Sequence, residues 1–97
     1  MKPELIELIV ELTAEILEGE GRTAPDLRED TKLFGPDGLL DSMGIISLVV
    51  ALEQGIEDLD GAVVSLADER ALSQTKGPYR TIGSLAEYAA TVLEHAR

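Results

Sequence analysis

The segment Lys32-Leu-Phe-Gly-Pro-Asp-Gly-Leu-Leu-Asp-Ser-Met43 contains the transition that decides how this chain folds. Its first half is rich in glycine and proline, which stop or turn a backbone. Residues 43–56, by contrast, contain no proline and carry apolar side chains at helical spacing. Asp41 is a favourable N-cap, so Ser42 is predicted at or near the first position of a helix. Its hydroxyl would project from a helix N-terminus, where free N–H groups and the helix dipole favour an attached phosphate.

Helical periodicity recurs on both sides of this transition. Residues 3–18 place an apolar stripe opposite a row of glutamates, and residues 82–95 form an apolar face behind a Thr81 cap. The helix that begins at the transition is predicted to span Ser42–Glu57, and a short helix is expected around Ala67–Ser73. The sequence therefore predicts an all-α fold, a small antiparallel bundle of three main helices plus one short helix.

The first connection, residues 22–40, is long for a compact domain, and loops of this length are usually functional or anchored. Its larger apolar side chains are predicted to pin it to the core, together with the apolar faces of the helices. The core predicted in this way comprises Leu5, Ile6, Ile9, Leu12, Thr13, Ile16, Leu17, Leu27, Leu33, Phe34, Leu39, Ile45, Leu48, Val49, Leu52, Ile56, Ile82, Leu85, Tyr88, Ala89, Val92 and Leu93. Residues 1–97 are expected to form a single domain.

Composition excludes several classes of function. The chain has no cysteine, so it forms no disulfide and uses no thiolate chemistry. Its apolar runs are far shorter than the roughly 20 residues of a membrane helix, which argues against membrane insertion. The opening Met1-Lys2-Pro3-Glu4 does not resemble a signal peptide, so a cytoplasmic protein is expected. A formal net charge of −11 argues against binding to nucleic acid.

The acidic residues are unevenly distributed. Between Lys32 and Arg70 there is no lysine or arginine, and this base-free interval includes Ser42. Such an interval is either a solvated face that maintains solubility or a surface that steers a basic partner toward Ser42.

The chain offers little for catalysis or metal binding. Its one histidine, His95, lies near the end of the last predicted helix, and no Gly-x-Ser-x-Gly motif surrounds Ser42. The acidic residues do not follow the EF-hand pattern, and Asp58-Leu-Asp60-Gly61 is interpreted as a turn after the second helix. No nucleotide-binding glycine loop is present. We therefore expect no catalytic residue and no metal site, and a hydrolase built on Ser42 and His95 is disfavoured.

Asp41-Ser42-Met43, followed by Val49-Val-Ala-Leu-Glu53, resembles the acyl carrier protein family, whose second helix opens with Asp-Ser-Leu. The resemblance extends over roughly residues 3–95. It implies a bundle with three long helices and a short third one, and a 4′-phosphopantetheine arm on the serine. A phosphopantetheinyl transferase would move this arm from coenzyme A to Ser42, so the domain would be a monomeric carrier and not an enzyme. It would present an acyl or aminoacyl thioester to partner enzymes with basic docking surfaces.

The chain departs from the family pattern near the serine. Met43 replaces the usual leucine and is expected to face the core. Gly44 and Ser47 stand where many fatty-acid carriers have acids, which argues against service to a general fatty-acid synthase. Asp-Ser-Met-Gly is similar to the carriers of D-alanine. Ile46 and Val50 either border the partner surface, as the resemblance implies, or are ordinary core residues.

A further departure is the segment from Ser65 to Thr81, which is longer than the family's usual third-helix region. It indicates either a carrier dedicated to one pathway or a tolerated surface insertion. Within it, Lys76-Gly-Pro-Tyr-Arg80 is predicted to form a turn. The two cations either pair with nearby acids, or Tyr79 and Arg80 recognise a partner or cargo. The alternative to a carrier is a non-modified helical module that binds a partner by apolar burial.

Overall fold

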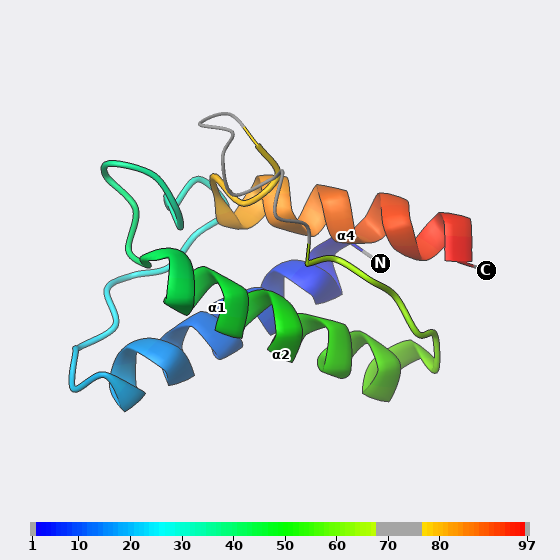
Figure 1. The fold of residues 1–97 in the computed structure, drawn as a ribbon, viewed down its shortest axis with the longest axis horizontal. Helices are drawn as coiled ribbons and strands as arrows, with labels where there is room; N and C mark the ends of the chain where they lie inside the picture. The colour runs from blue at the N-terminus through cyan, green and yellow to red at the C-terminus, as the bar shows by residue number, and fades with distance from the viewer. Residues whose placement is uncertain (1, 68–76, 97) are drawn as a thin grey trace.

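The computed structural model describes residues 2–67 and 77–96, which contain the helices α1 (Lys2–Gly19), α2 (Ser42–Asp60) and α4 (Ile82–Ala96). Helix α1 contacts both other helices and runs opposite to them (Figure 1). Over the described ranges the chain forms no strand, only an isolated β-bridge between Lys32 and Thr81. The all-helical prediction is confirmed. The short helix predicted at 67–73 falls, beyond Ala67, outside the described residues.

Helix α1 forms because its apolar residues recur at intervals of four and meet the core. Leu5, Ile9, Thr13 and Leu17 are buried on one face, and the glutamates between them point outward. The helix ends as predicted at its glycines. Gly21 adopts a φ of 77°, and the following amide of Arg22 donates to the Leu17 carbonyl at 2.9 Å. This left-handed residue closes the last turn.

Helix α2 is longer than predicted. The turn expected at 58–61 is wrong, because Asp58, Leu59 and Asp60 continue the helix. The helix stops only at Gly61, whose φ of 81° is left-handed and whose amide donates to the Glu57 carbonyl at 2.8 Å. The glycine, and not the aspartates before it, sets the end of the helix.

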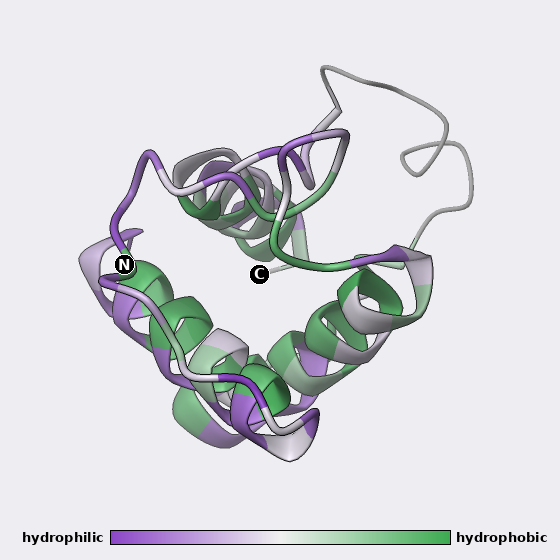
Figure 2. Cartoon of the chain, turned by 90° about the vertical axis from the view of Figure 1, so that its left-hand side faces the viewer, coloured by the Kyte–Doolittle hydropathy of each residue, from purple (hydrophilic) through white to green (hydrophobic). Residues whose placement is uncertain are grey.

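The buried side chains of the three helices and their connections form one core. In Figure 2, hydrophobic residues line the inner sides of α1 and α2, and the hydrophilic residues of α1 lie on its outer side. Leu33 is buried and Leu27, Phe34 and Leu39 pack partly buried against the core, so the predicted pinning of the first connection is confirmed. The core members absent from the predicted set are Leu40, Val64, Leu66, Tyr79 and Ala86.

The first connection is also tied to the start of α4 through its backbone. The amides of Ile82 and Gly83 donate to the carbonyls of Thr31 and Glu29 at 3.1 and 2.7 Å. The approach is close, since a Cβ on Gly83 would lie 2.6 Å from the Cγ atom of Glu29. These bonds satisfy helix-start amides that have no acceptor inside the helix. Among the described helices, none has the length and apolarity needed to cross a membrane.

Candidate site at the start of helix α2

Ser42 is the first residue of α2, as predicted, and it is exposed. Asp41 is the N-cap, with extended backbone angles of φ −83° and ψ −174°. Its carboxylate accepts a hydrogen bond from the Gly44 amide at 2.8 Å, and its carbonyl accepts one from the Ile45 amide at 2.9 Å. The amides of Ser42 and Met43 precede these, so they have no intrahelical acceptor and face the helix end.

The loop that leads into Ser42 is held in place by backbone hydrogen bonds. The amides of Leu39 and Leu40 donate to the carbonyls of Lys32 and Leu33 at 3.1 and 2.8 Å. Gly38 lies inside this narrow turn, where an added Cβ would be 2.6 Å from the Leu33 carbonyl oxygen. The predicted turn at 32–38 is thereby confirmed. The turn fixes the position of Asp41 and Ser42 relative to residues 32 and 33.

Two longer-range contacts fix the same loop to the rest of the molecule. The guanidinium of Arg22 donates to the Leu39 carbonyl at 2.8 Å, and the amide of Leu33 donates to the Arg80 carbonyl at 2.8 Å. Sequence reasoning did not identify Arg22 or the Arg80 carbonyl as contributors to the site. No local pattern signals them, because each joins segments far apart in the chain.

The hydroxyl of Ser42 makes no hydrogen bond with any other described residue. Together with Met43, Ile46 and Ser47, it lines an open depression on the surface of α2. An attached phosphate would therefore meet no obstruction, and the unpaired amides of Ser42 and Met43 lie where a phosphate at this helix end is favoured. An exposed hydroxyl beside free helix-start amides is the arrangement that an attached phosphate group would need.

The prediction that Met43 faces the core is wrong, since its side chain is 81% exposed. Burial at Ile45, Leu48 and Leu52 defines the inner face of α2, and Met43 lies about 200° around the helix from Ile45. Ile46 and Val50, for which burial was one option, are 41% and 52% exposed. Met43, Ile46 and Val50, spaced by three and four residues, form what we call the α2 outer stripe.

The position of Gly44 differs from that of Ser47. Gly44 is buried, and a Cβ there would lie 3.2 Å from the Cβ of Leu40 and 3.3 Å from the Asp41 carboxylate. A side chain at this position would require Leu40 or the Asp41 carboxylate to shift by a few tenths of an ångström. Ser47 is exposed, so an acidic residue at this position would lie on the surface. Of the two positions where many fatty-acid carriers have acids, the absence of an acid therefore changes the surface charge only at Ser47.

Glu53 belongs to the base-free interval but serves a structural role. Its carboxylate accepts hydrogen bonds from the amides of Leu66 and Ala67 at 2.5 and 3.1 Å. On the other side, the Tyr79 hydroxyl donates to the Leu66 carbonyl at 2.5 Å. The chain at 66–67 is therefore held between α2 and the segment that leads into α4.

Tyr79 is 2% exposed, and its ring packs edge-on against Tyr88 at 6.4 Å between centroids. The hypothesis that Tyr79 recognises a partner or cargo is therefore wrong, because burial removes it from contact with either. The turn predicted around it is confirmed at 77–80, where the Arg80 amide donates to the Gly77 carbonyl. Arg80 is exposed, and Lys76 lies outside the described residues.

The structure does not bring His95 to Ser42. His95 is exposed in the last turn of α4, and the start of α2 and the end of α4 lie at opposite ends of the bundle (Figure 1). The base that a serine hydrolase needs within hydrogen-bond reach is thus not supplied by this histidine. In the described residues, no group of three or more acids and histidines is arranged to hold a metal ion.

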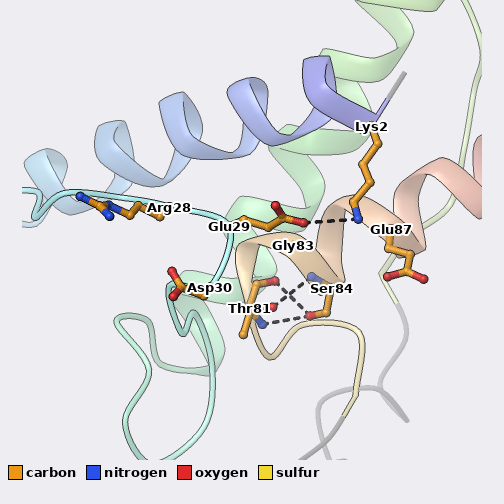
Figure 3. A pocket seen from close by; sticks show the side chains of 8 residues that line it. All are labelled: Lys2, Arg28, Glu29, Asp30, Thr81, Gly83, Ser84 and Glu87. Carbon is orange, nitrogen blue, oxygen red and sulfur yellow. Dashed lines mark hydrogen bonds and ion pairs between the residues drawn. The ribbon is translucent and has the colours of Figure 1, made fainter.

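A second depression lies where the first connection meets α4 (Figure 3). Lys2 pairs with Glu29 across it at 3.4 Å. On its floor, Thr81 and Ser84 cap the helix reciprocally, each side-chain oxygen accepting from the other residue's amide at 3.0 Å. Lys2, Glu29, Thr81 and Ser84 are therefore occupied with one another, and they join the first connection to the ends of α1 and α4. The predicted Thr81 cap is confirmed.

Comparison with protein-family models, with curated proteins and with solved structures found no match to this chain.

Proposed function

We propose that this protein is a carrier that holds an acyl or aminoacyl group as a thioester on a 4′-phosphopantetheine arm attached to Ser42. The observation that carries the proposal is an exposed serine hydroxyl at the capped N-terminus of α2, at the end of an anchored loop. The resemblance of Asp41-Ser42-Met43 to the acyl carrier signature supports it. The cargo would then belong to a specialised biosynthetic pathway in the cytoplasm.

In the proposed reaction, the Ser42 oxygen forms a bond to the phosphorus that carries the pantetheine of coenzyme A. The pyrophosphate bond breaks, and adenosine 3′,5′-bisphosphate leaves. The serine proton passes to a base of the phosphopantetheinyl transferase. The carrier contributes position and electrostatics, because the free helix-start amides and the dipole favour the phosphodiester anion. Asp41 contributes by holding the helix start.

The proposed partners are the transferase and the enzymes that load and remove the cargo. These enzymes would have basic docking surfaces, and the carrier itself would be a monomer. The negative charge of −11 supports this, because long-range attraction raises the encounter rate with a basic partner. The exposed acids nearest the candidate site in sequence are Asp37 and Asp41. The carboxylate of Asp37 lies 3.6 Å from the Lys32 ammonium, and because both side chains are exposed this pair offsets its charge only in part.

The test is the intact mass of the protein after incubation with coenzyme A and a phosphopantetheinyl transferase of broad specificity. Wild type is expected to gain one phosphopantetheinyl group, and Ser42→Ala is expected to fold and keep its unmodified mass. Ser47→Ala is the matched control, since Ser47 is also exposed on α2 but lies inside the helix. A mass gain that persists in Ser42→Ala contradicts the assignment.

The second candidate function is a non-modified interaction module, which the exposed α2 outer stripe favours. It makes a different prediction, because binding to a partner would then persist in Ser42→Ala. Failure of wild type to gain mass with several transferases would favour this candidate over the carrier.

A further inference from the structure

A groove, which we call the α1–α2 groove, lies between the first half of α1 and the last turns of α2. Its volume is about 470 Å³, which is room for several side chains of another molecule. Its apolar part is formed by Leu8, Gly55 and Leu59. Leu8 is partly buried, whereas Leu59 is 54% exposed. The apolar surface between the two helices is therefore open to solvent.

Gly55 shapes this apolar surface. A glycine inside a helix is less favourable than an alanine, so helix formation does not explain its presence in α2. A Cβ at this position would lie 2.9 Å from the Cδ2 atom of Leu8. Because glycine has no side chain, α2 presents bare backbone beside Leu8, and an apolar side chain that enters the groove can touch both Leu8 and Leu59.

Acidic side chains border the groove on both helices. Glu4, Glu7 and Glu11 line it from α1, and Asp58 lines it from α2. All four residues are exposed, and none of the described residues that line the groove is a lysine or an arginine. Within the part of the chain that the structure describes, Glu7, Glu11 and Asp58 form no ion pair. The negative charge of these three carboxylates is therefore available to cations from another molecule.

The spacing of the acids on α1 matches the repeat of a helix. Glu7 lies about 4.5 Å along the helix axis from Glu4, and Glu11 lies about 6 Å further on. Side chains on one face of a second helix recur at the same intervals of three and four residues. An amphipathic helix can thus lay its apolar face into the groove while its cations reach the acids on the border.

Charge excludes the other obvious occupants. A second copy of this chain would bring a further charge of −11, and nucleic acid would bring phosphates, to a border that is already acidic. A basic helix would instead gain attraction from both sides of the groove. Complementary charge of this kind mainly raises the rate of encounter and fixes orientation, whereas the apolar contact supports the affinity.

The groove lies apart from the candidate site at Ser42. With a rise of about 1.5 Å per residue, Gly55 is about 20 Å along the axis of α2 from the serine. At 100° per residue, it also points about 140° away from Val50 of the α2 outer stripe. A molecule bound in the groove would therefore leave the serine hydroxyl accessible.

We propose that the α1–α2 groove binds a basic amphipathic helix of a partner protein. An apolar side chain of that helix contacts Leu8 and Leu59, and its lysines or arginines lie beside the carboxylates on the border. This proposal is independent of the proposed function, because it uses neither Ser42 nor its neighbours. A contact at this place holds the protein in a complex while the start of α2 stays free for another molecule.

The test uses the full chain and a short fluorescein-labelled helical peptide, whose leucines recur every three or four residues between flanking lysines. Binding is measured by fluorescence anisotropy at physiological salt, and wild type is expected to bind one peptide saturably. Glu7→Lys/Glu11→Lys is expected to raise Kd at least about tenfold. Glu15→Lys/Glu18→Lys is the matched control, because it makes the same change of charge at exposed positions of α1 outside the groove. Its Kd should rise less than about threefold, since salt screens charges beyond roughly 8 Å.

A second pair of variants tests the apolar contact. Leu59→Ser is expected to raise Kd about fivefold without loss of stability, because this side chain is largely exposed. Val63→Ser is the control. Val63 is 77% exposed and does not line the groove, so its replacement should leave Kd unchanged.

Each outcome decides the proposal. Absence of saturable binding to wild type, or an equal rise in Kd for the two pairs of glutamates, overturns it, since only net charge would then matter. Equal affinity for a peptide with serines in place of its leucines would make the groove a site for cations alone, and also overturns it. So does dimerisation of wild type that Leu59→Ser abolishes, which would make the groove an interface between copies. None of these measurements involves the loading of Ser42, so they leave the proposed function untouched.

Discussion

At Gly38, the loop before Ser42 passes so close to itself that only a residue without a Cβ fits. An alanine there would place its Cβ 2.6 Å from the Leu33 carbonyl oxygen, and the neighbouring atoms are backbone, which moves only at a cost. Gly38→Ala is expected to lower the free energy of unfolding by about 1–3 kcal/mol, measured by urea denaturation. Because the loop positions Ser42, the loading rate should fall as well.

Gly19→Ala provides the control for this substitution. Gly19 closes α1, and no atom would lie within 4 Å of an added Cβ. Its stability is expected to be unchanged or slightly raised, since alanine loses less entropy in a helix than glycine. Equal stability of the two variants would show that the turn at 32–40 is not packed as described.

Tyr79 offers a second test at the scale of one residue. Tyr79→Phe removes the hydroxyl that donates to the Leu66 carbonyl, so the free energy of unfolding should fall by about 1 kcal/mol. The loading of Ser42 should keep its wild-type KM. Tyr88→Phe is the comparison, because Tyr88 is only partly buried beside it. Normal stability of Tyr79→Phe would contradict the structural role of this hydroxyl.

At the scale of elements, the attachment of residues 66–67 to α2 depends on the charge of Glu53. Glu53→Gln keeps the size of the side chain but weakens the hydrogen bonds that it accepts from the amides of Leu66 and Ala67. These two amides should exchange their hydrogens faster, and stability should fall by about 1 kcal/mol. Glu57→Gln, one turn later and exposed, should leave both exchange rates unchanged. Identical protection in the two variants would contradict this role of Glu53.

The helices were predictable because their apolar residues repeat with the helical period over long stretches, as at Leu5, Ile9 and Leu17. The end of α2 was not, because aspartates followed by glycine suit a turn as well as a helix C-terminus. The orientation of Met43 was assigned by resemblance, although the buried positions of α2 oppose it. For the candidate site, local cap chemistry predicted that Asp41 and Ser42 stand at the helix start, whereas the role of Ser42 was assigned by resemblance.

The pairing of segments that are distant in the sequence cannot be predicted from local sequence patterns. The bonds from the amides of Leu33 and Gly83 to the carbonyls of Arg80 and Glu29 join the first connection to the start of α4. Backbone groups of any residue type can form such bonds, so no side-chain pattern indicates them. The burial of Tyr79 follows from this same packing, and a tyrosine in a turn does not reveal it.

For the whole molecule, the charge of −11 should influence how fast partners arrive. The rate of association with the transferase is expected to fall as salt rises from low to physiological concentration, because screening shortens the range of attraction. Reversal of an exposed acid on α2 itself, Glu57→Lys, should slow loading more than Glu94→Lys, since Glu94 belongs to α4 and not to the helix that carries Ser42.

Both substituted glutamates are exposed, so their reversal tests charge without disturbing the core. Asp41 and Glu53 are unsuitable for this purpose, because their carboxylates hold the helix cap and the 66–67 segment. Equal slowing by Glu57→Lys and Glu94→Lys would mean that only net charge matters and that no face of the protein is preferred during approach.

The hydrogen bond from Leu33 to the Arg80 carbonyl also has a consequence for the order of events during synthesis. When Ser42 leaves the ribosome, Arg22 can already contact its loop, but Arg80 and the start of α4 have not yet been made. The loop acquires its final shape only after Arg80 and the start of α4 have emerged and folded back. A chain whose translation stops before that point would display the serine without this part of its framework, and under the proposed function it should be a poorer substrate for the transferase than the complete chain.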